Sequence, residues 1–300
     1  MAQVQILLST WNGERWLGEL LASLERQSFA DWELLVRDDG SQDQTNKLVL
    51  EWQRSHPHQL TQFLTDGQHL GSTASFSRLV ELSHAPYLMF CDQDDIWFPE
   101  KIEMSMAAIQ LLEQAHGHSR PLLVHTDMAV VAADKQLTSV SFWEARGFDV
   151  QQRKQAYLLN NVVSGCACLF NRAAADMAFP VPVGAMQHDR WLALVCAWFG
   201  FIRPIAQPLM FYRQHGQNEI GAEPREVSAE MVSARVEAWS RQAGAFLQRY
   251  GDELGSSDYR LVDALAELQY LKGWERRRHI LQHRLFKQGI LANLAMLLFA

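Results

Sequence analysis

Three carboxylates, Asp92, Asp94 and Asp95, follow directly after the apolar run 87–91. Carboxylates this close repel one another strongly unless a cation lies among them. Oxygen atoms are the ligands that Mg²⁺ and Mn²⁺ prefer, and both ions also bind substrate phosphates. The alternative is a plain turn that leads into a helix beginning near Pro99. Apolar residues on both sides of the cluster favour the metal site.

A second polar segment, DDGSQD at 38–43, follows the apolar run 32–36. The carboxylate of Asp38, at the end of a strand, can accept hydrogen bonds from the imide of uracil or thymine, or from ribose hydroxyls. The alternative is an ordinary turn in which Ser41 or Asp43 caps the next helix. Both interpretations can hold together, because different residues serve them.

A third segment, YRQHGQN at 212–218, follows another apolar run. Arg213 can bind a diphosphate, and His215 can complete a metal shell or contact the phosphates. A lone histidine is more often structural, so this segment alone does not decide between the two roles.

The elements that must position these residues are visible in the first 135 residues. Short apolar runs predict strands at 4–10, 32–36, 60–65, 87–91 and 122–124, and helical spacing predicts helices at 16–24, 43–55, 72–84 and 99–115. Repeated βα units predict an α/β fold with a mostly parallel sheet between helices. Ligands bind beyond the carboxyl ends of such strands, so the polar segments after the first, second and fourth strands should meet at one edge.

The second half of the chain is less regular. We expect strands at 162–170 and 209–213, a helix at 188–199 and a loop at 217–225. From about residue 226 the pattern is helical, apart from a break near Gly255.

Three segments in this order, LSTWNG at 8–13, VRDDGSQDQT at 36–45 and FCDQDDIW at 90–97, resemble glycosyltransferase family 2. Within that family the chain is similar to the rhamnosyltransferase-like bacterial members, over roughly residues 3–220. The resemblance implies a GT-A fold, with a nucleotide-sugar-binding and catalytic domain at 1–222 and a helical region at 223–300. It also implies inverting transfer from a UDP- or dTDP-linked sugar, with rhamnose as a candidate.

The resemblance assigns residues to nucleotide binding. Ser9, Asn12 and Glu14 match the first nucleotide-contacting loop, and Asp38 matches the acid that reads the base. Arg37 departs from the pattern, because the family more often has an apolar residue there.

The resemblance also assigns a metal site, with Mn²⁺ or Mg²⁺ as the cofactor. Asp92 and Asp94 match the DxD positions, and of the two Asp94 is the one expected to bind the metal directly. His215 is expected to join them, and Arg213 is expected to contact the diphosphate.

Asp189, in the segment HDRW at 188–191, matches the later acidic motif of the family, whose aspartate is the general base. Inverting transfer needs such a group, because the acceptor hydroxyl loses its proton as it attacks the anomeric carbon. The alternative is that Asp189 only begins a helix. The segment 161–168 resembles the part beneath the acceptor site, where Gly165 serves either close ligand approach or packing.

Composition limits the classes of protein. A net charge of −7 argues against a surface built for nucleic acid. The four cysteines lie in apolar stretches without a CxxC pair, which predicts buried free thiols in a reducing compartment. Residues 1–10 are typical of a first strand and not of a signal peptide, and no apolar run is long enough to span a membrane. We therefore expect a cytoplasmic protein, either free or at the inner face of the cytoplasmic membrane.

Residues 272–287 contain six basic residues and one acid, and 289–300 are strongly apolar. A basic helix followed by an apolar one suits an anionic bilayer surface. A helix packed on the body of the protein, or buried in a dimer, is the alternative. The lipid-linked glycans that such enzymes often use as acceptors favour the membrane.

The expected function is transfer of a sugar to a glycan or lipid-linked acceptor in bacterial surface polysaccharide or lipopolysaccharide synthesis. A nucleotidyltransferase would need a glycine-rich basic phosphate loop near the N-terminus, and 9–13 lacks one. A non-catalytic nucleotide-sugar-binding subunit is the other alternative. The acids Asp92, Asp94 and Asp189 favour the enzyme.

Overall fold

The computed structural model describes residues 2–216 and 228–299. The chain divides into two units, which are treated separately below. The larger comprises Met1–Gln151, Val162–Val181 and His188–Ala222, and the smaller comprises Gln152–Asn161, Pro182–Gln187 and Glu223–Ala300. The loop expected at 217–225 lies outside the described residues.

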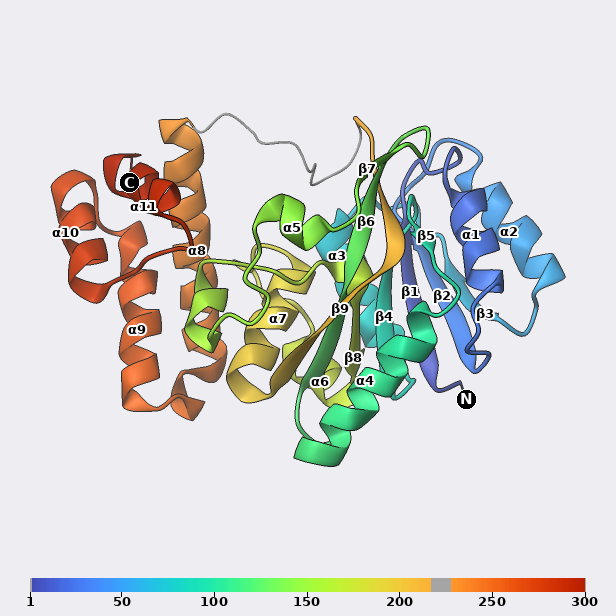
Figure 1. The fold of residues 1–300 in the computed structure, drawn as a ribbon, viewed down its shortest axis with the longest axis horizontal. Helices are drawn as coiled ribbons and strands as arrows, with labels where there is room; N and C mark the ends of the chain where they lie inside the picture. The colour runs from blue at the N-terminus through green and yellow to red at the C-terminus, as the bar shows by residue number, and fades with distance from the viewer. Residues whose placement is uncertain (1, 217–227, 300) are drawn as a thin grey trace. The chain divides into compact units, whose positions relative to one another are not determined.

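The larger unit is built on one mixed sheet (Figure 1). Its strands are β1 (Val4–Thr10), β2 (Trp32–Asp38), β3 (Leu60–Leu64), β4 (Tyr87–Asp92), β5 (Ile96–Trp97), β6 (Leu122–Ala132), β7 (Leu137–Ser139), β8 (Cys168–Asn171) and β9 (Phe201–Gln214). They lie in the order β3-β2-β1-β4-β8-β6-β9-β5, with β7 paired to β6. The first four strands pair in parallel, as predicted, whereas β8 pairs antiparallel with both β4 and β6.

The register of the parallel strands brings the polar segments to one edge of the sheet. Ser9 pairs with Arg37 on one side and with Asp92 on the other. Thr10 pairs with Asp38. The predicted convergence of the segments after β1, β2 and β4 is confirmed.

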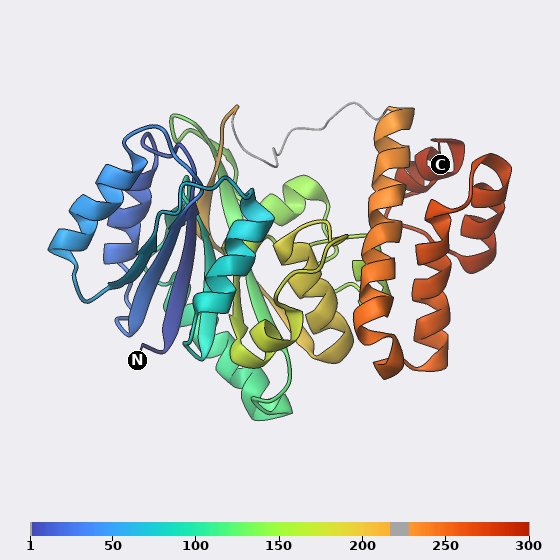
Figure 2. The same cartoon turned by 180° about the vertical axis from the view of Figure 1, so that it is seen from behind.

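Helices cover both faces of this sheet. They are α1 (Leu17–Glu25), α2 (Thr45–Ser55), α3 (Ser72–Leu82), α4 (Lys101–His116), α5 (Phe142–Arg146), α6 (Arg172–Ala178) and α7 (His188–Phe199). One face carries α1, α2 and α4, where Ile6 of β1 lies in the same buried apolar cluster as Leu20 of α1 and Ile109 of α4. The other face carries α3, α6 and α7 (Figure 2). Removal of these apolar side chains from water is the main favourable contribution to the fold.

The strand predicted at 162–170 is wrong over its first part. Residues Gly165–Ala167 form a short 3-10 helix, and only Cys168–Asn171 is a strand. The backbone N–H of Gly165 donates to the carboxylate of Asp189, so it is not available to a neighbouring strand. Strands β6 and β9 are longer than predicted, because polar residues such as His125 are buried within the sheet and interrupt the apolar pattern.

The smaller unit is helical, as predicted, with a break near Gly255. Its long helices are α8 (Ala229–Tyr250), α9 (Ser256–Ala266), α10 (Gly273–His283) and α11 (Ile290–Phe299). Among residues 2–216 and 228–299, none of the helices combines the length and the apolar character needed to cross a membrane. All four cysteines are buried free thiols, which confirms that prediction.

Candidate active site

Hydrogen bonds tie the loop after β1 to the loops after β2 and β4. The N–H of Trp11 donates to Oε1 of Gln93 over 2.9 Å, and Nε2 of Gln93 donates back to the carbonyl of Trp11 over 2.8 Å. The N–H of Asn12 donates to Oγ of Ser41, and Oδ1 of Asn12 accepts from the N–H of Gln42. Asn12 has a φ of 47°, a left-handed conformation that asparagine tolerates better than most residues. The segments 9–14, 38–43 and 92–95 thus form one connected rim, called the three-loop rim below.

Glu14 strengthens the link between the first two loops. Its N–H donates to Oδ2 of Asp43 over 3.0 Å, and its Oε2 accepts from the N–H of Gln44 over 2.8 Å. Asn12 and Glu14 were both predicted to contact the nucleotide. Both are exposed, and both also make hydrogen bonds within the rim.

The carboxylate of Asp38 is buried and engaged within its own loop. Oδ1 accepts from the hydroxyls of Thr10 and Ser41, and Oδ2 accepts from the N–H groups of Gly40 and Ser41. Each carboxylate oxygen accepts about two hydrogen bonds, so these donors use the capacity of the group. Asp38 can therefore contact a base only if one of these bonds is exchanged.

Sequence reasoning missed a buried ion pair between Arg37 and Asp39 beneath this loop. The Arg37 side chain is completely buried and also pairs with Asp66 over 3.1 Å. Burial raises the pKa of Asp39, but hydrogen bonds from the N–H groups of Leu70 and Gly71 and from Arg37 outweigh it and hold the pKa below its usual value. The signal in the sequence was the charged residue at position 37, where the resemblance led us to expect an apolar one.

Two exposed rings border the three-loop rim. The Trp11 side chain is 50% exposed, and its ring centroid lies 5.0 Å from that of His69. Exposed aromatic faces are suited to stacking on a nucleobase. Neither residue was among the predicted contacts.

The structure brings Asp94 and His215 together from distant parts of the chain. Oδ2 of Asp94 and Nε2 of His215 are 2.8 Å apart, and their side chains are 15% and 10% exposed. The ring of Trp16 stacks on His215 with an interplanar angle of 16°. A carboxylate oxygen and an imidazole nitrogen held in this way form two adjacent candidate metal ligands.

Arg213, predicted to contact the diphosphate, has protein partners instead. Its Nε donates to the carbonyl of Asp94, Nη1 donates to the carbonyl of Ala133, and Nη2 pairs with Glu19 over 2.6 Å. Its side chain is 1% exposed. This geometry makes Arg213 a support for the backbone of Asp94.

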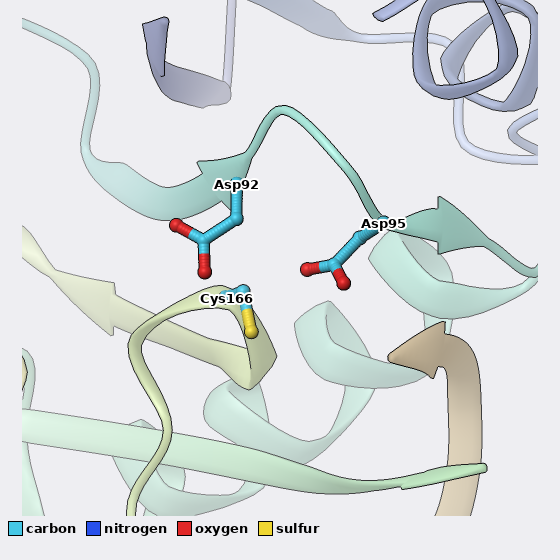
Figure 3. Close-up of side chains that lie close together, drawn as sticks. All are labelled: Asp92, Asp95 and Cys166. Atoms are coloured by element: carbon cyan, nitrogen blue, oxygen red, sulfur yellow. The ribbon is translucent and has the colours of Figure 1, made fainter. Parts of the chain in front are cut away.

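Asp92, Asp95 and Cys166 present oxygen or sulfur atoms that all lie within 4.8 Å of one another (Figure 3). Asp95 is fully buried, and within the described residues neither of its carboxylate oxygens meets an N–H or O–H donor. Burial, and then the charges of Asp94 and Asp92, raise the pKa of Asp95 well above its usual value, against the opposing charge of Lys101. A divalent cation among these carboxylates would stabilise their ionised forms, so the residues fit a metal.

The Cys166 thiol is a poor ligand for a hard cation. Burial raises its pKa well above the usual value, so the thiol stays protonated. The backbone of Cys166 has a different task, because its carbonyl accepts from Nζ of the fully buried Lys101. Lys101 therefore holds the turn Gly165–Ala167 beside the acidic segment 92–95.

Asp189 lies in the first turn of α7 and is hydrogen-bonded to the turn Gly165–Ala167. The N–H of Gly165 donates to Oδ2 of Asp189 over 3.1 Å, and Oδ1 accepts from the N–H of Arg190 over 2.6 Å. Burial raises the pKa of Asp189 to about 6, although these hydrogen bonds lower it in part. A Cβ atom on Gly165 would lie 2.9 Å from Nε2 of His188 and 3.3 Å from Cβ of Asp189. Gly165 thus allows α7 itself to approach closely.

Most of the predicted residues therefore lie on connected segments. These are Ser9, Asn12, Glu14, Asp38, Asp92 and Asp94 in the three-loop rim, His215 bonded to it, and Asp189 on the turn beside it. Arg213 also contacts the rim, through the carbonyl of Asp94, and its other guanidinium nitrogens are bonded to Ala133 and Glu19.

Residues 5–178 match the family model described as "Glycosyl transferase family 2". Among curated proteins, the chain is similar to the dTDP-rhamnosyl transferase RfbG of Shigella flexneri. The two are 27% identical over 231 residues, which cover 72% of this chain and 74% of that protein.

Solved structures show the same fold. TarS 1-349 of S. aureus, in complex with UDP-GlcNAc, matches with a TM-score of 0.59 and 17% identity over 93% of this chain and 78% of that one. The mannosyltransferase PcManGT of Pyrobaculum calidifontis, in complex with GDP-Man and Mn²⁺, matches with a TM-score of 0.58 and 14% identity over 95% and 73%. These likenesses confirm the predicted GT-A architecture.

Proposed function

The chain belongs to glycosyltransferase family 2, and from this premise we propose that it transfers a sugar from a nucleoside diphosphate sugar, with inversion, to a bacterial surface glycan or its lipid-linked precursor. One observation carries the proposal. The three-loop rim holds Asp94 against His215, and the turn at Gly165 and Cys166 links the acidic segment to Asp189.

The donor carries a pyrimidine nucleotide in this proposal. The proteins similar to this chain include a dTDP-rhamnosyl transferase and a protein solved in complex with UDP-GlcNAc. The exposed rings of Trp11 and His69 would stack on the base, and the Asp38 loop would border it. Rhamnose is the candidate sugar, by analogy with RfbG.

Asp92, Asp94 and His215 would hold Mn²⁺ or Mg²⁺, and PcManGT was solved with Mn²⁺. When bound, the ion neutralises negative charge on the departing diphosphate. Arg213 keeps the carbonyl of Asp94 in place, so it acts as a positioning residue.

Asp189 supplies the base. Its carboxylate accepts the proton of the acceptor hydroxyl while the hydroxyl oxygen forms a bond to the anomeric carbon from the face opposite the diphosphate. The bond from that carbon to the diphosphate oxygen breaks, and the nucleoside diphosphate leaves with the electron pair. A pKa of about 6 leaves Asp189 ionised at neutral pH and basic enough to take the proton.

A thermal-shift series with UDP, dTDP and GDP, each with and without Mn²⁺, tests the donor and the metal together. UDP or dTDP should raise the unfolding temperature, more strongly with Mn²⁺ than without it, because a ligand that binds the native state stabilises it. Equal responses to all three nucleotides without any effect of Mn²⁺ would overturn both assignments.

A further inference from the structure

Helix α10 turns basic and apolar side chains outward. Trp274, Arg278 and Leu281 are spaced by four and three residues, so they lie on one side of the helix. Trp274 is 72% exposed and Leu281 is 49% exposed. The opposite side buries Arg276 and Ile280. The exposed side of α10 is thus the one with the large apolar residues.

Helix α11 shows the same feature. Leu291, Leu294 and Leu298 recur at positions i, i+3 and i+7, and they are 82%, 50% and 63% exposed. Met296, between them in sequence, is 2% exposed and faces inward. Nη2 of Arg277, in α10, donates to the carbonyl of Leu298 over 2.8 Å. The two helices are therefore joined within one unit.

Six large apolar side chains are exposed between residues 274 and 298, and exposure of that kind is unfavourable in water and typical of interaction surfaces. The exposed cations around them are Lys272, Arg278 and Arg284, and Glu275 is the one acid in the segment 272–299. We propose that α10 and α11 form a docking surface for an anionic lipid bilayer, called the tail surface below. Its apolar members are Trp274, Leu281, Phe286, Leu291, Leu294 and Leu298.

The dimensions fit a helix that lies on the bilayer. A helix of ten residues, such as α11, is about 15 Å long, while the hydrocarbon core is about 30 Å thick. Leucine and tryptophan can enter the boundary between headgroups and acyl chains, and the arginines can remain among the anionic headgroups.

Charge favours a bilayer over a second copy of this chain. A symmetric dimer through the tail surface would bring together two surfaces of the same positive charge, each carrying Arg278 and Arg284. Anionic headgroups instead complement them. The choice of a bilayer also rests on the proposed function, because a lipid-linked acceptor is presented at such a surface.

Co-sedimentation of the full chain with vesicles tests the tail surface. The chain should bind vesicles of phosphatidylglycerol mixed with phosphatidylcholine much more strongly than phosphatidylcholine alone. Combined Leu291→Ser and Leu294→Ser substitutions should weaken binding at least about tenfold, because apolar burial is lost. Leu111→Ser, at a leucine of α4 with 49% exposure, is the matched control and should leave binding unchanged.

Combined Arg278→Gln and Arg284→Asn substitutions should weaken binding by about fivefold per lost charge, and added salt should reduce this difference. Arg54→Gln, at an exposed arginine of α2, is the matched control. Equal binding of the wild type to both kinds of vesicle, or a dimer in solution that the leucine variant disrupts, would overturn the proposal.

The outcome is separable from that of the proposed function. The thermal shift with UDP or dTDP reports nucleotide binding and does not involve the tail surface. A chain that responds to the nucleotide but ignores anionic vesicles would refute the tail surface alone. A chain that binds vesicles without any response to nucleotides would refute the proposed function alone.

Discussion

The N–H of Gly165 donates to Oδ2 of Asp189 over 3.1 Å, and this bond joins the proposed base to the turn that contains Cys166. The same turn lies against Asp92 and Asp95. The carboxylate that would take a proton from the acceptor and Asp92, one of the proposed metal ligands, thus both lie beside one short piece of backbone. A direct displacement requires that the base and the metal site keep a fixed separation, because the acceptor hydroxyl must attack in line with the departing diphosphate.

Asp189→Asn should lower kcat by about 10²–10⁴-fold, because the amide cannot accept the proton of the acceptor hydroxyl. The thermal shift with the nucleotide should stay as in the wild type. Asp176→Asn is the control, since Asp176 is 68% exposed. Turnover of Asp189→Asn close to that of the wild type would rule out this base.

The pKa of Asp189, about 6, should be visible in the pH profile. Below this pH the base is protonated, so kcat/KM should fall by about tenfold for each further pH unit. Above it, activity should reach a plateau. A profile that is flat down to pH 5 would contradict the role of this carboxyl group.

The same carboxyl group should also affect stability. Activity rises as Asp189 loses its proton, whereas its contribution to the stability of the fold falls. The folded pKa of about 6 lies above the reference value of 3.8, so the protonated carboxyl group contributes stability below about pH 4. That contribution is lost as the pH rises through about 6. The unfolding temperature of Asp189→Asn relative to the wild type should therefore be higher at pH 8 than at pH 4, as calorimetry can show.

Gly165→Ala should reduce kcat strongly, because the new Cβ would meet His188 and Asp189 and displace the base. Gly18→Ala is the matched control. Among residues 2–216 and 228–299, apart from the adjoining backbone of helix α1, no atom lies within 4 Å of a Cβ at Gly18, so that change should be harmless or slightly stabilising. Equal activities of the two variants would show that the spacing at Gly165 does not matter.

His215→Ala should raise the Mn²⁺ concentration needed for half-maximal activity. Loss of a group in or next to a metal site typically weakens metal binding by about 10–100-fold. His58→Ala, at an exposed histidine, should leave the requirement unchanged. An unaltered Mn²⁺ titration of His215→Ala would exclude the histidine from the metal site.

Arg37→Leu should destabilise the fold by about 3–5 kcal/mol, because it leaves the buried carboxylate of Asp39 without its cation. Adding Asp39→Asn should recover part of the loss. Arg26→Leu, at an exposed position, should change the stability by less than about 0.5 kcal/mol. Denaturant unfolding measures all three.

Local pattern was enough to predict most of the elements around the site. Helical spacing of leucines located α1, and the apolar runs located β1, β2 and β4. Since parallel strands end at the same edge, the order of these elements also predicted that Ser9, Asp38 and Asp92 would converge. The choice of Asp94 and His215 as neighbours came from the family resemblance, and the structure places them in contact.

The partners of buried polar groups were not predictable in this way. Arg213 was expected at the diphosphate but donates to the carbonyl of Asp94 and pairs with Glu19. Arg37 was noted only as a departure from the family pattern, and it pairs with Asp39. The first part of the strand expected at 162–170 is not a strand, because Asp189 accepts the hydrogen bond of the Gly165 N–H, whereas Cys168–Asn171 is a strand.

The sequence by itself determined the α/β order, the family and the edge of the sheet where the polar segments meet. The tertiary structure decided which charge faces which, and which sides of α10 and α11 are exposed. The physical reason is that the apolar periodicity that predicts helices and strands depends only on residues close together in the sequence. A buried hydrogen bond or ion pair instead depends on the position of groups far away in the chain, and the cost of leaving such a group without a partner is fixed only after they have packed.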